Sequence, residues 1–489
     1  MQFPLLSVLI FTPLVAGIAI LALPEAKKSL ARSISLVASA IVLLVGLGIY
    51  FNYSKALGGY QLVEKAPWLP QFGISYHVGV DGMSLPLVVL TGLVMVAGTL
   101  VSWNITDRPR EFFAFFMFLG TSVLGVFCAL DLFLLFFFFE LAVFPKYLMI
   151  VMWGSPQTKL YGGMKLTLYL FIGSMISLIG ALAIYFGSGL KTFDMPALES
   201  AGFPAGFQYI WFPIVFLGFA ILGGMFPFHS WAPDGHVAAP TATSMFLAGV
   251  EMKVGVYAAL RVAIELLPEG ARQWVWLIFV LATINVVYGA FIALVQKDFK
   301  YIIGFSSVSH MGLVLIGLAT LNRNGLIGAG MQMFSHGVMF ALFFAIVGMV
   351  YDRTHTRELA KLGGLAKIMP WAAIGFIVGG LVSMGMPGFS GFVAEFPIFM
   401  GVWQANPLVA IIAILGVIIT AGYIFLTIRR VFFGELPEAL KATPDVSWMD
   451  KVVIGGLSAI MILIGWFPSL MVPWIESGVS TILKLLGGA

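Results

Sequence analysis

Charged residues are scarce in this sequence, and cysteine is almost missing. Only 10% of the 489 residues are charged, 60% are hydrophobic, and the mean hydropathy is +1.03. Water-soluble proteins carry about a quarter charged residues, so this composition excludes a soluble domain and indicates a membrane protein. The one cysteine, Cys128, excludes disulfide frameworks, iron–sulfur clusters and thiolate zinc sites, because each of these needs several thiols.

The sequence also lacks the glycine-rich motifs that hold nucleotide phosphates. Neither GxGxxG after a strand nor GxxxxGK followed by Ser or Thr is present. The formal net charge of +4 is too small to indicate nucleic acid. We therefore expect no cofactor, no metal ion and no nucleic-acid partner for this chain, and we expect any redox step to take place elsewhere.

Long apolar runs fill most of the chain. Because about 20 apolar residues cross a bilayer as a helix, the runs predict an all-α polytopic membrane protein of about fourteen transmembrane helices. The first run has no basic region before it and no small-residue cleavage site, so we expect it to be retained. The predicted spans are 4–23, 31–52, 83–103, 111–130, 132–153, 163–187, 209–227, 241–265, 273–295, 301–320, 325–351, 369–403, 407–431 and 451–473.

Lysine and arginine are shared unevenly between the two sets of loops. Seventeen lie in or beside the odd-numbered loops, and six lie in or beside the even-numbered ones. Cytoplasmic loops carry the excess of these residues, so we expect both termini on the non-cytoplasmic side. This pattern predicts a multi-pass protein of the cell inner (plasma) membrane.

Two of the predicted spans contain breaks. Glycine and proline interrupt the seventh span at 223–227 and the twelfth span at 385–391, and both residue types weaken a helix. Paired interrupted helices are typical of inverted-repeat transporters whose ion path lies near the membrane midplane. Glycine and proline are also common in membrane helices without such a role.

Ionisable residues lie deep inside several predicted spans. Glu140 follows eight consecutive apolar residues and stands six positions before Lys146, while Glu251 and Lys253 share the eighth span and Glu395 lies in the twelfth. A charged side chain at the bilayer centre costs about 2.5–3.5 kcal/mol on insertion scales, so we interpret these residues as functional. The alternative is a set of structural ion pairs that join helices.

Glu251 and Lys253 cannot satisfy each other directly on a regular helix. Two positions correspond to about 200° of rotation, so each side chain needs a partner on a different neighbouring helix or in a hydrated cavity. Lysine can load and release a proton when it is buried, which favours a proton path through Lys253. Arg261 stays protonated, and we expect it to snorkel to the interface.

Two histidines lie in consecutive apolar spans, His310 in SSVSHMG and His336 in MQMFSHG. Histidine passes a proton at little cost near its ordinary pKa, so both are candidate relay residues, and a packing role is the alternative. His229, Asp234 and His236 in PFHSWAPDGH do not have the HExxH-like spacing of a helical metal site. We expect that segment to close the broken seventh helix.

Several motifs together make this sequence resemble the antiporter-like membrane subunits of respiratory complex I, the chain M group of NADH-quinone oxidoreductases above all. The resemblance covers nearly the whole chain, and it implies two inverted five-helix repeats, each with a broken helix, and a proton-translocating role. The motifs are GVDGMS at 79–84, DLFLLFFFFELAVFPKY at 131–147, PFHSWAPDGHVAAPTATSMFLAGVEMKVGVYAALR at 227–261, KDFKYIIGFSSVSHMG at 297–312 and MPGFSGFVAEF at 386–396.

The resemblance also implies roles for single residues. Glu140 matches the family's essential fifth-helix glutamate, Lys253 its central eighth-helix lysine and Glu395 its twelfth-helix glutamate. His310 and His336 match the histidines that connect them. The implied units are helices one to three in 1–110, one repeat in 111–265, a second repeat in 266–431, and a last loop and helix in 432–489.

The sequence departs from the family pattern at three positions. The seventh helix of the family carries a lysine that pairs with the fifth-helix glutamate, and the matching residue here is Leu222. Lys146 and Glu251 stand where apolar residues are usual. We hypothesise that Lys146 fills, from the fifth helix, the place of the missing lysine, and that Glu251 adds a negative charge beside the path.

The sequence therefore predicts a proton-translocating membrane subunit of a complex I-type NADH-quinone oxidoreductase, a non-redox part of that enzyme. Its partners are other membrane and peripheral subunits of the assembly and the lipid bilayer. The path runs through Lys253, His310 and His336 to Glu395, and the Glu140 charge regulates it. The alternatives are the D-type component of a multisubunit Na⁺/H⁺ antiporter, a component of a membrane-bound hydrogenase, and a structural spacer that does not pump.

Overall fold

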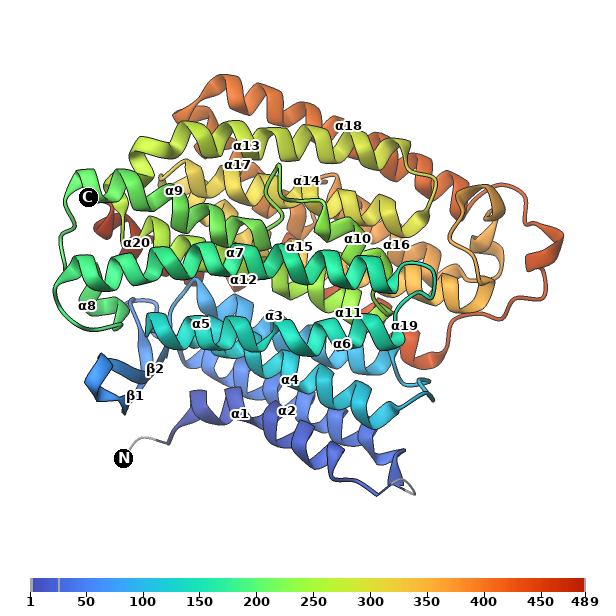
Figure 1. Ribbon diagram of the computed structural model, residues 1–489. Helices are drawn as coiled ribbons and strands as arrows, with labels where there is room; N and C mark the ends of the chain where they lie inside the picture. Colours follow the sequence, from blue (N-terminus) through green and yellow to red (C-terminus); the bar gives the residue numbers. More distant parts are fainter. Residues whose placement is uncertain (1–2, 25–26, 488–489) are drawn as a thin grey trace.

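Long helices run side by side in one bundle (Figure 1). The computed structural model describes residues 3–24 and 27–487. Eleven helices in these residues are long and apolar enough to cross a membrane. The short first helix and the eighth and twelfth spans, each built from shorter helices, bring the number of crossings in these residues to fourteen. The first part of the chain contains α1 (Leu5–Leu21), α2 (Leu30–Asn52), α3 (Ser84–Val101), α4 (Pro109–Cys128), α5 (Leu132–Leu141), α6 (Val143–Trp153), α7 (Lys159–Ser188), α8 (Met195–Glu199), α9 (Ala205–Leu222) and α10 (Trp231–Ala238).

The eighth span is assembled from four short helical pieces, and two of them are π-helical. They are α11 (Thr241–Phe246), the π-helix η3 (Leu247–Glu251), α12 (Met252–Ala258) and the π-helix η4 (Ala259–Ile264). The remaining long helices are α13 (Pro268–Val295), α14 (Phe299–Ala319), α15 (Arg323–Thr354), α16 (Pro370–Ser383), α17 (Ser390–Ala405), α18 (Pro407–Val431), α19 (Trp448–Trp466) and α20 (Val472–Leu485).

Local sequence signals explain where several helices begin. The Asp131 carboxylate accepts hydrogen bonds from the first backbone amides of α5, and Asp298 does the same for α14. Ser447 and Asp450 form a capping box at the start of α19. Each of these side chains satisfies backbone donors that the first turn of a helix leaves free.

Both predicted helix breaks are confirmed. α9 ends at Leu222 and α10 begins at Trp231, whereas α16 ends at Ser383 and α17 begins at Ser390. Gly224 and Gly385 lie in the two breaks with positive φ angles of 77° and 62°, a backbone conformation that favours glycine. The breaks therefore follow from glycine and proline in the sequence, and they divide two membrane helices near their middle.

Four features of the fold were not predicted. The fifth span is interrupted at Ala142, between α5 and α6, and the eighth contains the π-helical turns η3 and η4. Residues 61–80 form an antiparallel hairpin of β1 (Gln61–Leu69) and β2 (Ile74–Val80). The predicted span 451–473 is too long at its end, because α19 ends at Trp466 and the separate helix α20 follows.

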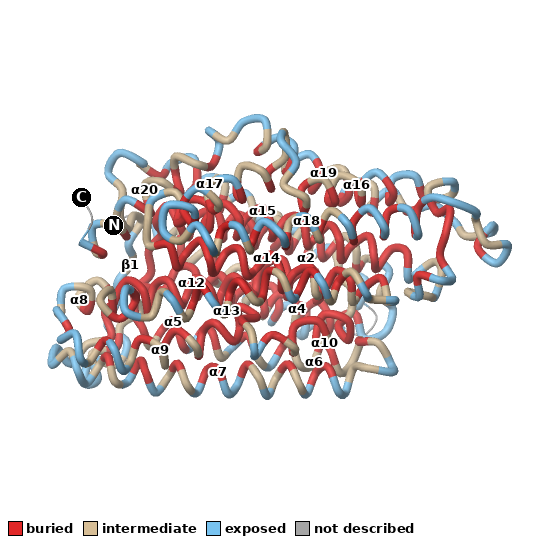
Figure 2. Tube along the Cα trace, turned by 90° about the horizontal axis from the view of Figure 1, so that it is seen from above, coloured by how far each residue is buried: buried red, intermediate tan, exposed pale blue. Residues whose placement is uncertain are grey.

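The central helices α14 and α15 are surrounded by the rest of the bundle. In their most apolar windows, 94% of α14 and 100% of α15 are buried inside the protein, against 39% of α7 and 33% of α18. Figure 2 shows the same contrast, with buried helices in the interior and exposed residues along α7. Side chains on α14 and α15 therefore lie away from lipid.

Two ends of the bundle can be distinguished. The hairpin, α8 and α20 gather at one end, to the left in Figures 1 and 2. Trp474 of α20 stacks on Tyr50 of α2 with ring centroids 4.7 Å apart. The described parts of the odd-numbered loops lie at the opposite end in Figure 1, and these loops and their flanks contain most of the lysine and arginine residues. The terminal residues 1–2 and 488–489 lie outside the described residues.

Candidate functional site

Lys253 lies in the centre of the protein and contacts a histidine of another helix. Its ammonium group donates to the carbonyl oxygen of Ala248, and its Nζ lies 2.5 Å from Nδ1 of His336 on α15. Both side chains are fully buried. Nε2 of His336 lies 3.2 Å from the hydroxyl oxygen of Ser307 on α14, so both ring nitrogens of His336 have polar neighbours.

His310 continues this arrangement toward the break between α16 and α17. Its ring centroid lies 6.0 Å from that of His336, its Nδ1 lies 3.4 Å from Oε1 of Glu395, and its Nε2 lies 2.9 Å from Oγ of Ser383. Gln332 donates to the same Glu395 oxygen over 3.3 Å. We call Lys253, His336, His310 and Glu395 the central row.

The Glu395 carboxylate lies against the break between α16 and α17. A Cβ added to Gly385 would lie 2.6 Å from Oε2 of Glu395, so glycine at this turn lets the carboxylate fold back against the backbone. Glu395 is 4% exposed. The break therefore ends the central row at a buried carboxylate.

Glu251 and Lys253 do face different helices, as predicted. Oε1 of Glu251 forms an ion pair with the Lys146 ammonium of α6, and both side chains are 2% exposed. Lys253 instead faces His336. Two of the three departures of this sequence, Lys146 and Glu251, are therefore the two halves of one buried ion pair.

Glu140 contacts neither Glu251 nor Lys253 and has a neighbour on α7 instead. Oε1 of Glu140 accepts a hydrogen bond from Ser174 of α7, and Lys146 acts on Glu140 electrostatically without a direct contact. The carboxylate also lines an apolar cavity of about 790 Å³ between phenylalanine side chains of α4 and α5. Glu140 thus lies at the edge of the bundle and does not touch the central row.

Leu222, the position of the missing seventh-helix lysine, is apolar and 3% exposed. A Cβ added to Gly255 would come within 2.8 Å of the Leu222 Cβ, so the end of α9 packs directly on α12. The buried ammonium of Lys146 binds Glu251. That Lys146 substitutes for the missing lysine stays a prediction.

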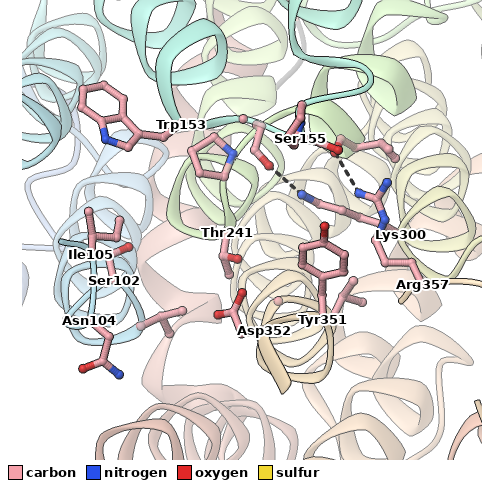
Figure 3. Close-up of a pocket in the computed structure, with 18 of the residues that line it drawn as sticks. Ser102, Asn104, Ile105, Trp153, Ser155, Thr241, Lys300, Tyr351, Asp352 and Arg357 are labelled. Atoms are coloured by element: carbon pink, nitrogen blue, oxygen red, sulfur yellow. Dashed lines mark hydrogen bonds between the residues drawn. The ribbon is translucent and has the colours of Figure 1, made fainter. Parts of the chain in front are cut away.

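A polar cavity of about 390 Å³ opens at the end of the bundle that carries the odd-numbered loops (Figure 3). Lys300 donates to the carbonyl of Ala239 over 2.7 Å, and Arg357 donates to that of Val237 over 3.1 Å. These carbonyls lie at the carboxyl end of α10, where a helix leaves its acceptors unpaired. The two cations therefore hold α10 in place beside the cavity.

The segment with His229, Asp234 and His236 is held by ordinary contacts. The Asp234 carboxylate accepts hydrogen bonds from Lys165 over 2.7 Å and from Tyr301 over 2.9 Å. His236 packs against Phe344, and neither of its ring nitrogens has a hydrogen-bond partner in the described residues. Lys300, beside the cavity, and Lys253, in the central row, both act electrostatically on His236.

The expectation that Arg261 snorkels to the interface is wrong. Its guanidinium group is 3% exposed, lies 2.5 Å from Asp81 and donates to Glu265 over 2.9 Å. It also faces the ring of Tyr257. We call Asp81, Arg261 and Glu265 the outer cluster. Arg261 is buried because two carboxylates compensate its charge. One of them, Asp81, lies in the loop before α3, and the sequence alone does not show that this loop meets Arg261.

Asp194 fastens the hairpin to α8 at the same end of the bundle. Burial opposes its charge, but hydrogen bonds from His77 and Lys65 hold the pKa of Asp194 well below its ordinary value. A carboxylate whose pKa is lower in the folded protein stabilises the fold above its unfolded pKa of about 4. This stabilisation is lost as the pH falls through the folded pKa.

We therefore expect the hairpin and α8 to loosen at acidic pH. Backbone hydrogen exchange in β1 and α8, corrected for intrinsic rates, is expected to be faster at pH 3 than at pH 6. Asp194→Asn is expected to show fast exchange at both values. If wild-type protection in these segments is equal at the two pH values, Asp194 does not fasten them.

Sequence reasoning missed the neutral residues that connect the site. Gln332 bridges His310 and Glu395, Ser383 contacts His310 and Ser174 holds Glu140. Serine and glutamine carry no charge and are tolerated in membrane helices, so nothing in their local sequence marks them. Only the carboxylates, lysines and histidines gave a signal, because burying an ionisable group is costly.

Comparison with known proteins assigns the chain to a family. A family model described as NADH:quinone oxidoreductase/Mrp antiporter, TM, matches residues 129–420, more than half of the chain. The chain belongs to this family. A relative within the NADH:quinone oxidoreductase/Mrp antiporter family, the NADH-quinone oxidoreductase subunit M of Rhodobacter capsulatus, is 38% identical over 98% of this chain and 96% of its own length. The NAD(P)H-quinone oxidoreductase chain 4 of Gloeobacter violaceus is 37% identical over 96% of this chain and 90% of its own.

Solved structures of the family have the same architecture. A chain of respiratory complex I from Thermus thermophilus with bound NADH gives a TM-score of 0.91 at 29% identity, covering 99% of this chain and 100% of that chain. A chain of the Mrp complex from Dietzia sp. gives a TM-score of 0.86 at 19% identity, covering 99% and 100%. The second likeness concerns the fold alone. The predicted fold class, with two five-helix repeats that each contain a broken helix, is confirmed.

Proposed function

We propose that this chain is a proton-translocating membrane subunit of a complex I-type NADH-quinone oxidoreductase. The observation that carries this proposal is the central row, in which four buried titratable side chains from α12, α14, α15 and α17 follow one another across the middle of the protein. Its relatives at 37–38% identity bear the names of quinone oxidoreductase subunits. The likeness to the Mrp complex concerns the fold, so it favours this function less.

The proton route starts at the polar cavity near Lys300. A proton passes His236 and reaches Lys253, which donates it to Nδ1 of His336, 2.5 Å away. The rings of His336 and His310 are 6.0 Å apart, so we expect a water molecule to carry the proton between them. His310 then protonates Glu395 at Oε1, beside the broken twelfth helix.

The subunit takes no part in electron transfer. Its single cysteine cannot supply the ligands of an iron–sulfur cluster, and we assign quinone reduction to other membrane and peripheral subunits. We place the chain in the cell inner (plasma) membrane with both termini on the non-cytoplasmic side, because the lysine and arginine residues concentrate in the odd-numbered loops. We infer that it carries no cofactor.

Glu395→Gln in the assembled complex tests this function. Glutamine keeps the volume of the side chain and can still accept from Gln332, but it cannot take a proton from His310. We expect the proton-to-electron ratio in proteoliposomes to fall, while quinone reduction with an uncoupler stays within about twofold of wild type. The control is Glu476→Gln at an exposed surface pair with Arg323. An unchanged ratio in a normally assembled complex would favour the spacer alternative.

A further inference from the structure

Among the described residues, the ion pair of Lys146 and Glu251 is the most deeply buried charge pair outside the central row and the outer cluster. It joins α6 to the π-helical turn η3, and each side chain is 2% exposed. Oε1 of Glu251 accepts a hydrogen bond from the Lys146 ammonium group, whereas Oε2 has no hydrogen-bond partner in the described residues. The carboxylate is therefore only half satisfied.

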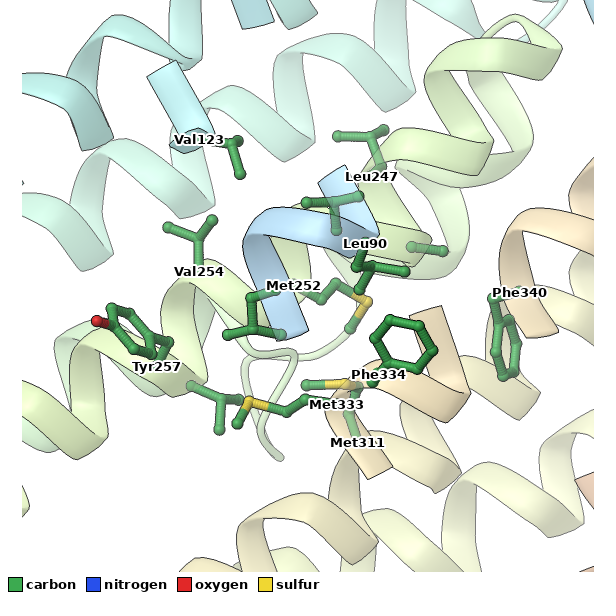
Figure 4. Packing of buried hydrophobic residues seen from close by; sticks show 14 of the residues in the cluster. Leu90, Val123, Leu247, Met252, Val254, Tyr257, Met311, Met333, Phe334 and Phe340 are labelled. Atoms are coloured by element: carbon green, nitrogen blue, oxygen red, sulfur yellow. The ribbon is translucent and has the colours of Figure 1, made fainter. Parts of the chain in front are cut away.

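A buried ion pair of this kind contributes little to the stability of the fold. Removing two charges from water costs more than their attraction returns unless all their polar atoms are paired, so well-packed apolar side chains would hold the same helices at least as well. The unpaired Oε2 adds the cost of a buried acceptor without a donor. Figure 4 shows the apolar side chains of Leu247, Met252 and Val254 on the same span. The pair thus needs an explanation other than packing.

The pair is mechanically connected to Lys253. The Lys253 ammonium donates to the carbonyl of Ala248, and Ala248 lies inside η3, the turn that ends at Glu251. A π-helical turn contains one residue more than an α-helical turn and is frequent at functional sites. Any change in η3 therefore moves the acceptor of Lys253 and the Glu251 carboxylate together.

The other partner, Lys146, stands just after a local interruption of the fifth span. Lys146 follows Pro145, and α6 begins just after the interruption at Ala142. Proline removes a backbone donor from the helix and leaves a carbonyl one turn earlier unpaired. A tilt of α6 about Ala142 would draw the Lys146 ammonium away from Glu251 without unfolding either helix.

We propose that the Lys146–Glu251 pair is the charge switch that sets whether Lys253 holds a proton, an assignment that rests on the proposed function. With the pair closed, Lys146 cancels the Glu251 charge, and Lys253 gives its proton from Nζ to Nδ1 of His336. With the pair open, the Glu251 carboxylate two residues away is uncompensated and holds the proton on Lys253. Movement of α6 thus makes Lys253 release its proton and take up the next one in turn.

Glu140 is less suited to this role in the present structure. It is bound to Ser174 at the edge of the bundle, whereas Glu251 lies on the same span as Lys253. A signal that arrives at Glu140 reaches Lys253 through Lys146, because Lys146 acts on both carboxylates. Lys146 therefore couples the edge of the bundle to its centre.

The test compares variants of the assembled complex in proteoliposomes. Lys146→Met together with Glu251→Leu replaces the pair by apolar side chains, so we expect normal assembly and normal uncoupled quinone reduction. We expect the proton-to-electron ratio to fall to the value of Lys253→Met. A wild-type ratio in this double variant would overturn the switch and leave the pair as a helix contact.

A charge-exchanged variant keeps the test decisive if the apolar variant does not assemble. Lys146→Glu with Glu251→Lys retains a buried pair but moves the carboxylate from the eighth span to α6. We expect a low ratio in this variant and a wild-type ratio in the control Glu476→Gln, at the exposed pair with Arg323. A wild-type ratio after charge exchange would overturn the assignment. If Lys253→Met itself keeps the wild-type ratio, the proposed function fails, not only the switch.

Discussion

Replacing Lys253 with methionine is expected to remove this subunit's share of proton translocation. The ammonium of Lys253 is the group that contacts Nδ1 of His336, so its loss interrupts the central row at its first transfer. Loss of a positioned proton carrier slows a transfer by about a hundredfold or more. The measurement is the proton-to-electron ratio of the complex in proteoliposomes, with uncoupled quinone reduction measured in parallel.

Lys253→Arg separates charge from proton transfer. Arginine keeps a positive charge beside His336 but does not release its proton in proteins, so we expect the same loss of translocation. His355→Gln, in a loop position at the end of α15, serves as a histidine control that leaves the ratio unchanged. Translocation by Lys253→Arg at the wild-type ratio would mean that the charge alone is needed and that no proton passes through this residue.

Replacing Arg261 with methionine is expected to prevent stable assembly. The substitution leaves Asp81 and Glu265 buried without their cation, and breaking a buried pair by removing one partner costs about 3–5 kcal/mol. A folded protein has only about 5–15 kcal/mol of stability in total. We expect a large fall in the amount of assembled complex, measured on native gels, and a lower thermal unfolding temperature for what remains.

Arg323→Met is the matched control for this prediction. Arg323 also pairs with a glutamate, Glu476, but its side chain is 64% exposed, and exposed pairs contribute about 0–1 kcal/mol. We expect assembly close to the wild-type level. Equal behaviour of the two variants would show that burial does not govern the contribution of Arg261.

The sequence indicated most clearly the residues whose burial in the membrane costs the most free energy. Burying a charge in a membrane is so unfavourable that Lys253, His310, His336 and Glu395 could be selected from composition and spacing, and the structure places them in one row. The break after Leu222 followed in the same way from glycine and proline. These features are local, so one sequence suffices to indicate them.

Pairing between distant helices could not be predicted in this way. Rotation along a helix shows that Glu251 points away from Lys253, but it does not say which helix Glu251 meets. That Lys146 meets it depends on the tilt of α6 after Ala142 and on the π-helical turn η3. The burial of Arg261 depends likewise on Asp81, which comes from a loop 180 residues away in the chain.

The burial of α15 has a consequence for how the bilayer influences this protein. All of its most apolar window is enclosed by other helices, so no acyl chain touches the stretch of α15 that carries the buried His336. Changes in lipid thickness or fluidity then reach the central row only by displacing peripheral helices such as α7 and α18. Proton transfer should accordingly tolerate varied phospholipid mixtures, provided that these peripheral helices keep their positions.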